Sequence, residues 1–130
     1  MGIKGKKKKS ERDMKFEKKL AARAISEWKN QYPRYSSLKE VLRVARAGSV
    51  EVFWSLLIED VQRSSHFFES TLNKTAAKVA EASREGDTKT ILDGYEVLLK
   101  LQNFRDLSTT GFRKIVKKAD KVFSDRKSVV

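Results

Sequence analysis

The sequence predicts an all-α protein in which an N-terminal helical hairpin packs on a bundle with a long central helix. Apolar residues recur at the three- to four-residue spacing of a helix through most of the 130 residues, and no segment alternates with the two-residue period of a strand. The single proline, Pro33, separates two helical patterns near the N-terminus. A chain of this length can form one domain with a sizeable core.

The first expected helix runs from about Met14 to Gln31. Its apolar residues lie four positions apart and therefore share one face; they are Phe16, Leu20, Ala24 and Trp28. Ser26 is a candidate interruption of this helix. Pro33 follows and ends the pattern, because proline has no backbone N–H to continue a helix.

A short second helix is expected after this break. Ser37 and Glu40 have the spacing of a capping box, in which the first residue is the N-cap. The helix would end near Ala47, because Gly48 suits a C-terminal stop. The two helices and the break between them form a helical hairpin.

The third expected helix is the longest and begins after Ser49. Its apolar stripe keeps a helical period over about 34 residues, and Trp54, Ile58 and Phe67 widen it. A stripe of this width indicates contacts on two sides. The helix would end at Gly86.

Asp87 is the expected N-cap of a fourth helix. The apolar seam of this helix includes Ile91, Tyr95, Leu98 and Leu99. Residues 108–111, with the sequence Ser-Thr-Thr-Gly, predict a break before a last helix. The folded domain is expected to span residues 14–123, with a frayed C-terminus over residues 124–130.

The last helix has a cationic face. At about 100° per residue, its lysines share one narrow arc, and its apolar residues lie on the opposite face; the lysines are Lys114, Lys117, Lys118 and Lys121. Like charges four residues apart cost about 0.2–0.5 kcal/mol per pair. Only Asp120 is near enough in sequence to offset them. A multiply charged anion would relieve this repulsion.

Positive charge gathers at both ends of the chain. The formal net charge is +12. Residues 1–47 have 15 Lys and Arg against 5 Asp and Glu, whereas residues 48–103 have 6 against 9 and residues 104–130 have 8 against 3. Residues 1–13 are expected to form a disordered basic tail. If the two basic ends meet in the fold, they form one anion-binding surface.

Composition excludes several classes of function. There is no cysteine, which excludes disulfides and thiolate chemistry, and the single histidine, His66, cannot form a His-rich metal site alone. No apolar run approaches the roughly 20 residues of a membrane span, and the basic start lacks a secretory signal. We therefore expect an intracellular protein, in the cytoplasm or facing it, with any attachment to an organelle membrane made through partners.

Two segments of the chain together carry a recognisable pattern. The first comprises Met14-Lys15-Phe16 followed by Trp28-Lys29, Tyr32, Tyr35, Leu38 and Lys39. The second comprises residues 99–105 and 110–121. They resemble the opening pattern "MKF … EWR..Y..Y..LK" and the closing pattern "LLQNY..LN.TGFRKILKK.DK" of the SPX domain, a family of intracellular inositol polyphosphate and pyrophosphate sensors. Together the two segments bracket residues 14–123.

The resemblance implies a three-helix-bundle core and a phosphate-binding surface between the hairpin and the lysine helix. It places Tyr35, Lys39 and Lys118 in the phosphate-binding cluster. It places Lys114, Lys117 and Lys121 in an adjoining lysine surface cluster, with Lys15 as a further contact. The implied ligand is inositol hexakisphosphate or an inositol pyrophosphate. The implied role is phosphate homeostasis signalling, through an effector domain or protein that this chain does not contain.

Other readings of the same residues remain open. The lysine face can be a solvated helix surface, and Tyr35 can be a packed ring with its hydroxyl in water. A basic helical module binding nucleic acid or anionic membrane is the alternative function, although the aromatic residues have core spacing rather than that of a stacking platform. No catalytic set, glycine-rich phosphate loop or metal-ligand cluster is evident, so we expect neither catalysis nor a cofactor.

Overall fold

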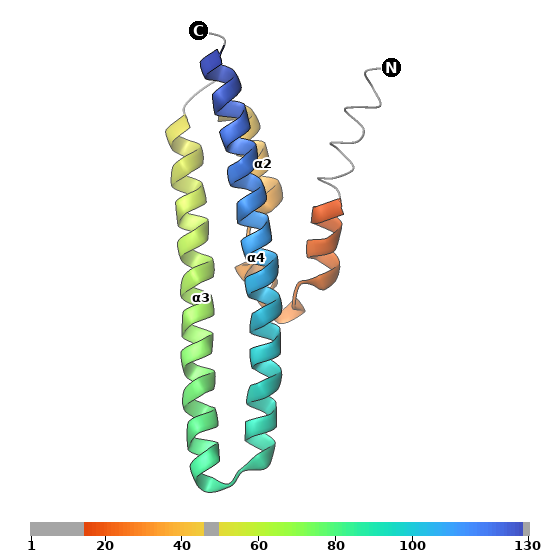
Figure 1. The fold of residues 1–130 in the computed structure, drawn as a ribbon, viewed down its shortest axis with the longest axis vertical. Coiled ribbons are helices and arrows are strands. Elements are labelled where there is room, and N and C mark those ends of the chain that lie inside the picture. Colours follow the sequence, from red (N-terminus) through yellow and green to blue (C-terminus); the bar gives the residue numbers. More distant parts are fainter. Residues whose placement is uncertain (1–14, 46–49, 129–130) are drawn as a thin grey trace.

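The computed structural model describes residues 15–45 and 50–128, and all structural statements below refer to this part of the chain. Residues 15–23 are helical. They are followed by the 3₁₀ helix η1 (Ser26–Gln31) and three α-helices, α2 (Tyr35–Ala45), α3 (Val50–Glu85) and α4 (Thr88–Ser128) (Figure 1). The described residues include no strand. The predicted all-α fold class is therefore confirmed.

The long helices α3 and α4 form an antiparallel hairpin with a tight connection. Gly86 has a φ of 70°, a left-handed conformation that glycine adopts without steric cost. The N–H of Asp87 then donates to the Ala82 carbonyl at 2.9 Å, which closes the end of α3. The Asp87 carboxylate caps α4 by accepting from the Thr90 N–H at 3.2 Å. The predicted stop and cap are both confirmed.

The predicted break at residues 108–111 is wrong, because α4 is one continuous helix of 41 residues. Gly111 is buried where α4 meets residues 15–23, which we call the N-terminal segment. A Cβ at this position would lie 3.1 Å from Cζ of Phe16 and 3.4 Å from Cγ of Pro33. Glycine costs about 1 kcal/mol in a helix, and this close packing offsets the cost. Helix α4 extends to Ser128, and the frayed C-terminus expected over residues 124–130 stays a prediction.

The first helix is shorter than predicted: it ends at residue 23, whereas the prediction extended it to Gln31. Ile25 is extended, and its N–H donates to the Tyr32 hydroxyl at 2.9 Å. That hydroxyl donates to Oδ1 of Asn103 on α4 at 2.8 Å, and Nδ2 of Asn103 donates to the Arg23 carbonyl at 3.1 Å. The side chains of Tyr32 and of Asn103 on α4 thus satisfy the Ile25 N–H and the Arg23 carbonyl, which an uninterrupted helix would have satisfied by its own hydrogen bonds.

Helix α2 begins three residues earlier than the capping box predicted, because a helix with Ser37 as its N-cap would begin at residue 38. It starts at Tyr35, and the N–H of Leu38 already donates to the Arg34 carbonyl at 2.9 Å. Ser37 is therefore inside the first turn and is not the N-cap. The predicted stop at Gly48 and the Ser49 cap lie outside the described residues, as does the predicted tail over residues 1–13.

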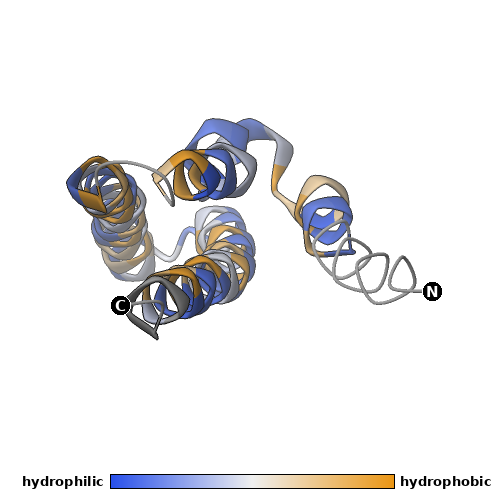
Figure 2. Cartoon of the chain, turned by 90° about the horizontal axis from the view of Figure 1, so that it is seen from above, coloured by the Kyte–Doolittle hydropathy of each residue, from blue (hydrophilic) through white to orange (hydrophobic). Residues whose placement is uncertain are grey.

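The core lies where α2 and the N-terminal segment cover one half of the α3–α4 hairpin. Helices α2, α3 and α4 contact one another in pairs, and Figure 2 shows them as one group, with residues 15–23 beside it. Four large side chains are less than 2% exposed, namely Phe53, Leu101, Phe104 and Ile115. Burying such a side chain stabilises the fold by about 1.5–3 kcal/mol. The expected two-sided contact of the third helix is confirmed, because α3 packs on both α2 and α4.

Candidate anion-binding surface

The two basic ends of the chain lie side by side. Phe16 from the N-terminal segment and Tyr35 from α2 share one core cluster with Ile115 and Ala119 from α4. Figure 1 shows α2 alongside the C-terminal part of α4. The apolar stripe of the last helix is buried as predicted at Ile115 and Ala119, which are both 0% exposed. The lysines on the opposite face therefore point away from the core.

An aromatic pair connects the two lysine clusters that the sequence predicted. The rings of Phe16 and Tyr35 lie 4.9 Å apart between centroids, inclined at 60°. The Nζ of Lys114 lies 5.8 Å from the Phe16 centroid, and the Nζ of Lys39 lies 5.8 Å from the Tyr35 centroid. Both distances suit cation–π contacts. The structure thus brings Lys39 of α2 and Lys114 of α4 to the same aromatic pair.

The other predicted residues of the phosphate-binding cluster are less accessible than Lys114. Lys118 is half-buried on α4, one helical turn beyond Lys114. Tyr35 is only 2% exposed, so its ring is packed in the core, as one of the two interpretations of the sequence held, but almost none of the residue reaches water.

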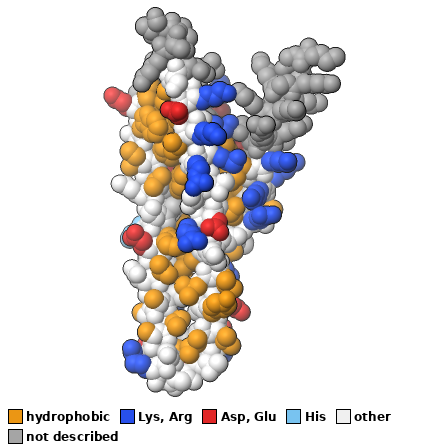
Figure 3. All heavy atoms as spheres, in the orientation of Figure 1, with side chains coloured by type: hydrophobic (Ala, Val, Ile, Leu, Met, Phe, Trp, Pro, Cys, Tyr) orange, Lys and Arg blue, Asp and Glu red, His pale blue; other side chains and the backbone are white. Residues whose placement is uncertain are grey.

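The lysine surface cluster is open to solvent. Lys114, Lys117 and Lys121 are exposed on α4, and among the described residues no ion pair involves any of them. Figure 3 shows a column of Lys and Arg side chains over α4 and further ones on the neighbouring N-terminal segment. Lys15 is exposed at the start of that segment. No ion pair with an acidic side chain of residues 15–45 or 50–124 therefore offsets the charge of Lys114, Lys117 or Lys121.

Glu17 is an acidic neighbour that was not among the predicted site residues. Its Oε1 accepts from the Nζ of Lys39 at 2.7 Å. The side chains of Lys39 and Glu17 are 35% and 29% exposed, respectively. The sequence contains one signal for an acid near the site, because Glu17 replaces the glycine that commonly follows the family's "MKF" pattern. Predicting the contact also required the position of α2 beside the N-terminal segment.

A second set of polar contacts fixes the hairpin on α3. The carboxylate of Asp60 is 5% exposed, and it accepts from the Arg34 N–H at 2.9 Å and from the Arg63 guanidinium at 2.6 Å. Arg63 also donates to the carbonyls of Asn30 and Tyr32. Ser64 donates to the Gln31 carbonyl at 2.7 Å. These bonds hold the turn that leads into α2 and so position Lys39 relative to α4.

Three groups with shifted pKa values lie away from the lysines of the candidate site. Burial raises the pKa of the Tyr32 hydroxyl, against the lowering effect of its hydrogen bond with Ile25. The hydrogen bond that Lys100 donates to the Glu27 carboxylate raises the pKa of Lys100. Hydrogen bonds from Thr90 lower the pKa of Asp87. Each of these groups belongs to a structural contact rather than to the candidate site.

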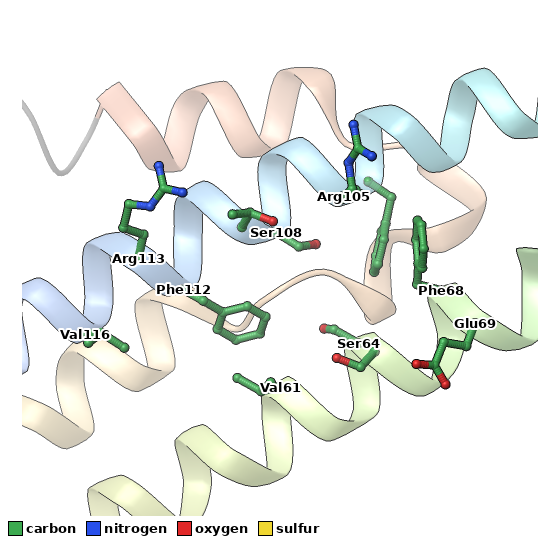
Figure 4. A pocket seen from close by; sticks show the side chains of 12 residues that line it. Val61, Ser64, Phe68, Glu69, Arg105, Ser108, Phe112, Arg113 and Val116 are labelled. Carbon is green, nitrogen blue, oxygen red and sulfur yellow. The ribbon is translucent and has the colours of Figure 1, made fainter.

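A groove of about 550 Å³ lies between α3 and α4 (Figure 4). Val61, Phe68, Phe112 and Val116 supply apolar walls, and Arg105, Arg113 and Glu69 also line it. The hydroxyl of Ser108 is buried in this region and has no hydrogen-bond partner. The apolar walls make the groove poorly suited to a polyanion, which needs several cations in reach.

This geometry defines a class of protein. It is an all-α module that has a cationic surface between a helical hairpin and a long helix. The family model for the SPX domain matches residues 59–128. This match covers more than half of the 130 residues. The chain therefore belongs to the SPX domain family.

Three curated relatives are similar to this chain over most of its length. A xenotropic and polytropic retrovirus receptor 1 homolog from Danio rerio is 26% identical over 85% of this chain. The corresponding Xenopus laevis protein is 27% identical over 84% of the chain, and solute carrier family 53 member 1 from Cricetulus griseus is 26% identical over 84%. In each case the match covers 24% of the relative.

No solved structure matches the chain significantly. Within residues 15–45 and 50–128, no helix is long and apolar enough to cross a membrane. The same residues include no group of three or more His, Cys, Asp or Glu side chains that could hold a metal ion.

Proposed function

We propose that this chain is a sensor domain that binds inositol polyphosphates or inositol pyrophosphates and takes part in phosphate homeostasis signalling. The observation that carries the proposal is the meeting of Lys39 and Lys114 on the Phe16–Tyr35 pair. Membership of the SPX domain family supports it. The proposed role is binding and regulation rather than catalysis.

The chemistry of the surface suits a small ligand with many phosphates. Each lysine ammonium is a compact charge with three donors, which can bind phosphate oxygens in several orientations. Lys39 and Lys118 would bind at the hairpin side, whereas Lys114, Lys117 and Lys121 would bind along α4. Lys15 is the further contact, and Tyr35 would add a hydrogen bond through its hydroxyl. Because the α4 lysines are exposed, affinity should fall with salt.

The regulated effector would lie outside this chain. The relatives include a solute carrier and retrovirus receptor homologs, and the chain spans about a quarter of their length. We propose that ligand binding changes the contact between this domain and an attached or separate effector. Such a role places the domain in the cytoplasm or facing it, where inositol phosphates are dissolved.

Titration calorimetry with inositol hexakisphosphate tests the proposed site. Replacing Lys39, Lys114 and Lys118 together by alanine should weaken binding at least about tenfold, because hydrogen bonds to charged groups contribute about 1.5–3 kcal/mol. The matched control replaces Lys74, Lys78 and Lys89, three exposed lysines near the other end of the hairpin. The control changes the net charge equally and should leave affinity nearly unchanged. Equal affinity of both triple variants would refute the site.

A competition experiment separates the proposal from the alternative function. The domain is offered duplex DNA or anionic vesicles at physiological salt, with and without inositol hexakisphosphate. We expect weak binding that the inositol phosphate abolishes, because non-specific attraction to polyanions is salt-sensitive. Tight binding without competition would instead identify a nucleic-acid or membrane module.

A further inference from the structure

Glu17 places a carboxylate on a lysine of the proposed phosphate-binding cluster. Its Oε1 lies 2.7 Å from the Nζ of Lys39, and the two residues are 22 positions apart in the sequence. Both side chains are largely withdrawn from solvent, at 29% and 35% exposure. This pair is thus less screened by water than an exposed surface pair.

The carboxylate of Glu17 stands at the junction between the two lysine clusters. Lys39, its partner, also lies 5.8 Å from the centroid of the Tyr35 ring. Tyr35 packs on Phe16, and Lys114 lies 5.8 Å from the Phe16 centroid. A carboxylate oxygen 2.7 Å from an ammonium has the geometry that a phosphate oxygen would adopt there. The unliganded surface therefore has one anion already in place.

We infer that Glu17 is an affinity-determining residue: its carboxylate occupies the phosphate position at Lys39, and a ligand must displace it. This inference rests on the proposed function. Displacement breaks the Glu17–Lys39 pair, and the displaced carboxylate then repels the bound phosphates. A ligand that also reaches Lys114, Lys117 and Lys121 gains enough contacts to offset this cost, whereas a single phosphate does not.

The Glu17→Gln variant tests the inference, because it removes the charge and keeps the shape of the side chain. Calorimetric titration with inositol hexakisphosphate should give a Kd about fivefold lower than that of the wild type, the upper range of an ion-pair coupling near the surface. Inorganic phosphate should remain a weak ligand of both proteins. Thermal melting of each variant checks that the fold is kept.

Glu27→Gln is the matched control. Glu27 also accepts from a lysine at 2.7 Å, but its partner is Lys100 on an exposed surface away from the lysine clusters. The substitution changes the net charge by the same amount. We expect its Kd to stay within about twofold of the wild-type value. An equal gain in both variants would show an effect of net charge alone and would overturn the inference.

A double-mutant cycle with Lys39→Ala separates competition at Lys39 from a general field effect. If Glu17 acts by occupying Lys39, the gain from Glu17→Gln should be clearly smaller when Lys39 is absent, because only the repulsion between the carboxylate and the phosphates then remains. The same gain in both backgrounds would overturn the inference, as would wild-type binding that Glu17→Gln does not tighten. If neither the wild type nor Glu17→Gln binds any inositol phosphate, the proposed function itself is wrong and the inference falls with it.

Discussion

The two halves of the α3–α4 hairpin differ in what covers them. In the half near residue 53 of α3 and residue 115 of α4, α2 and the N-terminal segment supply further layers, and Phe53 and Ile115 are 0% exposed. In the half near the Gly86 turn, Figure 1 shows no other described element over the two helices, and Leu92 and Tyr95 are 59% and 58% exposed. Figure 3 shows hydrophobic side chains on the surface of this lower half.

This difference shows that the covering elements provide both the core and the candidate site. A pair of helices can bury only the residues along its seam, so most apolar side chains of the lower half remain in solvent. The elements that complete the core of the other half also bring Lys39 to Lys114. We therefore expect substitutions in the covered half to affect stability and binding together, whereas substitutions in the uncovered half should leave binding intact.

The largest expected effect is on stability, from Phe53→Ala in the covered half. Phe53 is 0% exposed and packs against Trp54 and Phe123, with centroid distances of 5.1 and 6.1 Å. Removing a buried phenylalanine should lower the free energy of unfolding by about 3–5 kcal/mol. Chemical denaturation measures the change. Leu92→Ala is the control in the uncovered half and should change it by no more than about 0.5 kcal/mol; equal losses would contradict the comparison.

The next effect is the separation of stability from binding at two glycines of α4. Gly111 is covered by Phe16, and a Cβ at Gly94 would collide with Cγ2 of Val79 in the uncovered half. Leucine at either position should cost about 1–3 kcal/mol through overpacking. Only Gly111→Leu should also weaken binding of inositol hexakisphosphate, because it displaces the Phe16–Tyr35 pair. Equal binding losses in the two variants would argue against a site confined to the covered half.

Tyr32→Phe should have a smaller effect that depends on pH. At neutral pH the variant loses the hydroxyl's bonds with Ile25 and Asn103, at a cost of about 1–2 kcal/mol. Because burial raises the pKa of Tyr32 above 10.0 in the folded state, the wild type should be destabilised as pH rises above that value. The variant should show a flatter alkaline profile in chemical denaturation. Parallel profiles for the two proteins would mean that Tyr32 does not contribute to alkaline unfolding.

The smallest expected effect comes from Asp87→Ala at the exposed turn of the uncovered half. The variant loses the cap on α4 and should melt at a slightly lower temperature. Because the pKa of Asp87 is lowered from 3.8 in the folded state, its contribution is present above that value and lost as pH falls below it. Wild type and variant should therefore converge in acid. A difference in melting temperature that stays constant into acid would contradict this role of the Asp87 carboxylate.

The parts of the fold that could be predicted depend on neighbouring residues. The end of α3 at Gly86 and the cap at Asp87 were correct because a left-handed glycine and an N-cap act within one helical turn. The opposition of the lysines to Ile115 and Ala119 follows from helical periodicity in the same way. The family pattern added the expectation that the hairpin and the last helix meet.

The features that were missed depend on contacts between distant residues. Gly111 was expected to break a helix, but the approach of Phe16 and Pro33 makes it a packing residue. The first helix ends early, and the Asn103 side chain on α4 supplies hydrogen bonds there. It donates to the Arg23 carbonyl, 80 positions away, and accepts from the Tyr32 hydroxyl. The Glu17–Lys39 pair could not be derived from spacing, because neither residue has a helical relation to the other.

Local sequence thus accounts for the helices, their charged and apolar faces, and the turn that joins α3 to α4, since each depends on side chains within a few residues. Long-range packing accounts for the uninterrupted course of α4, the early start of α2 and the meeting of Lys39, Glu17 and Lys114 around two aromatic rings. The physical reason is one of magnitude. A glycine in a helix costs about 1 kcal/mol relative to alanine, whereas burial of a single aromatic side chain contributes about 1.5–3 kcal/mol.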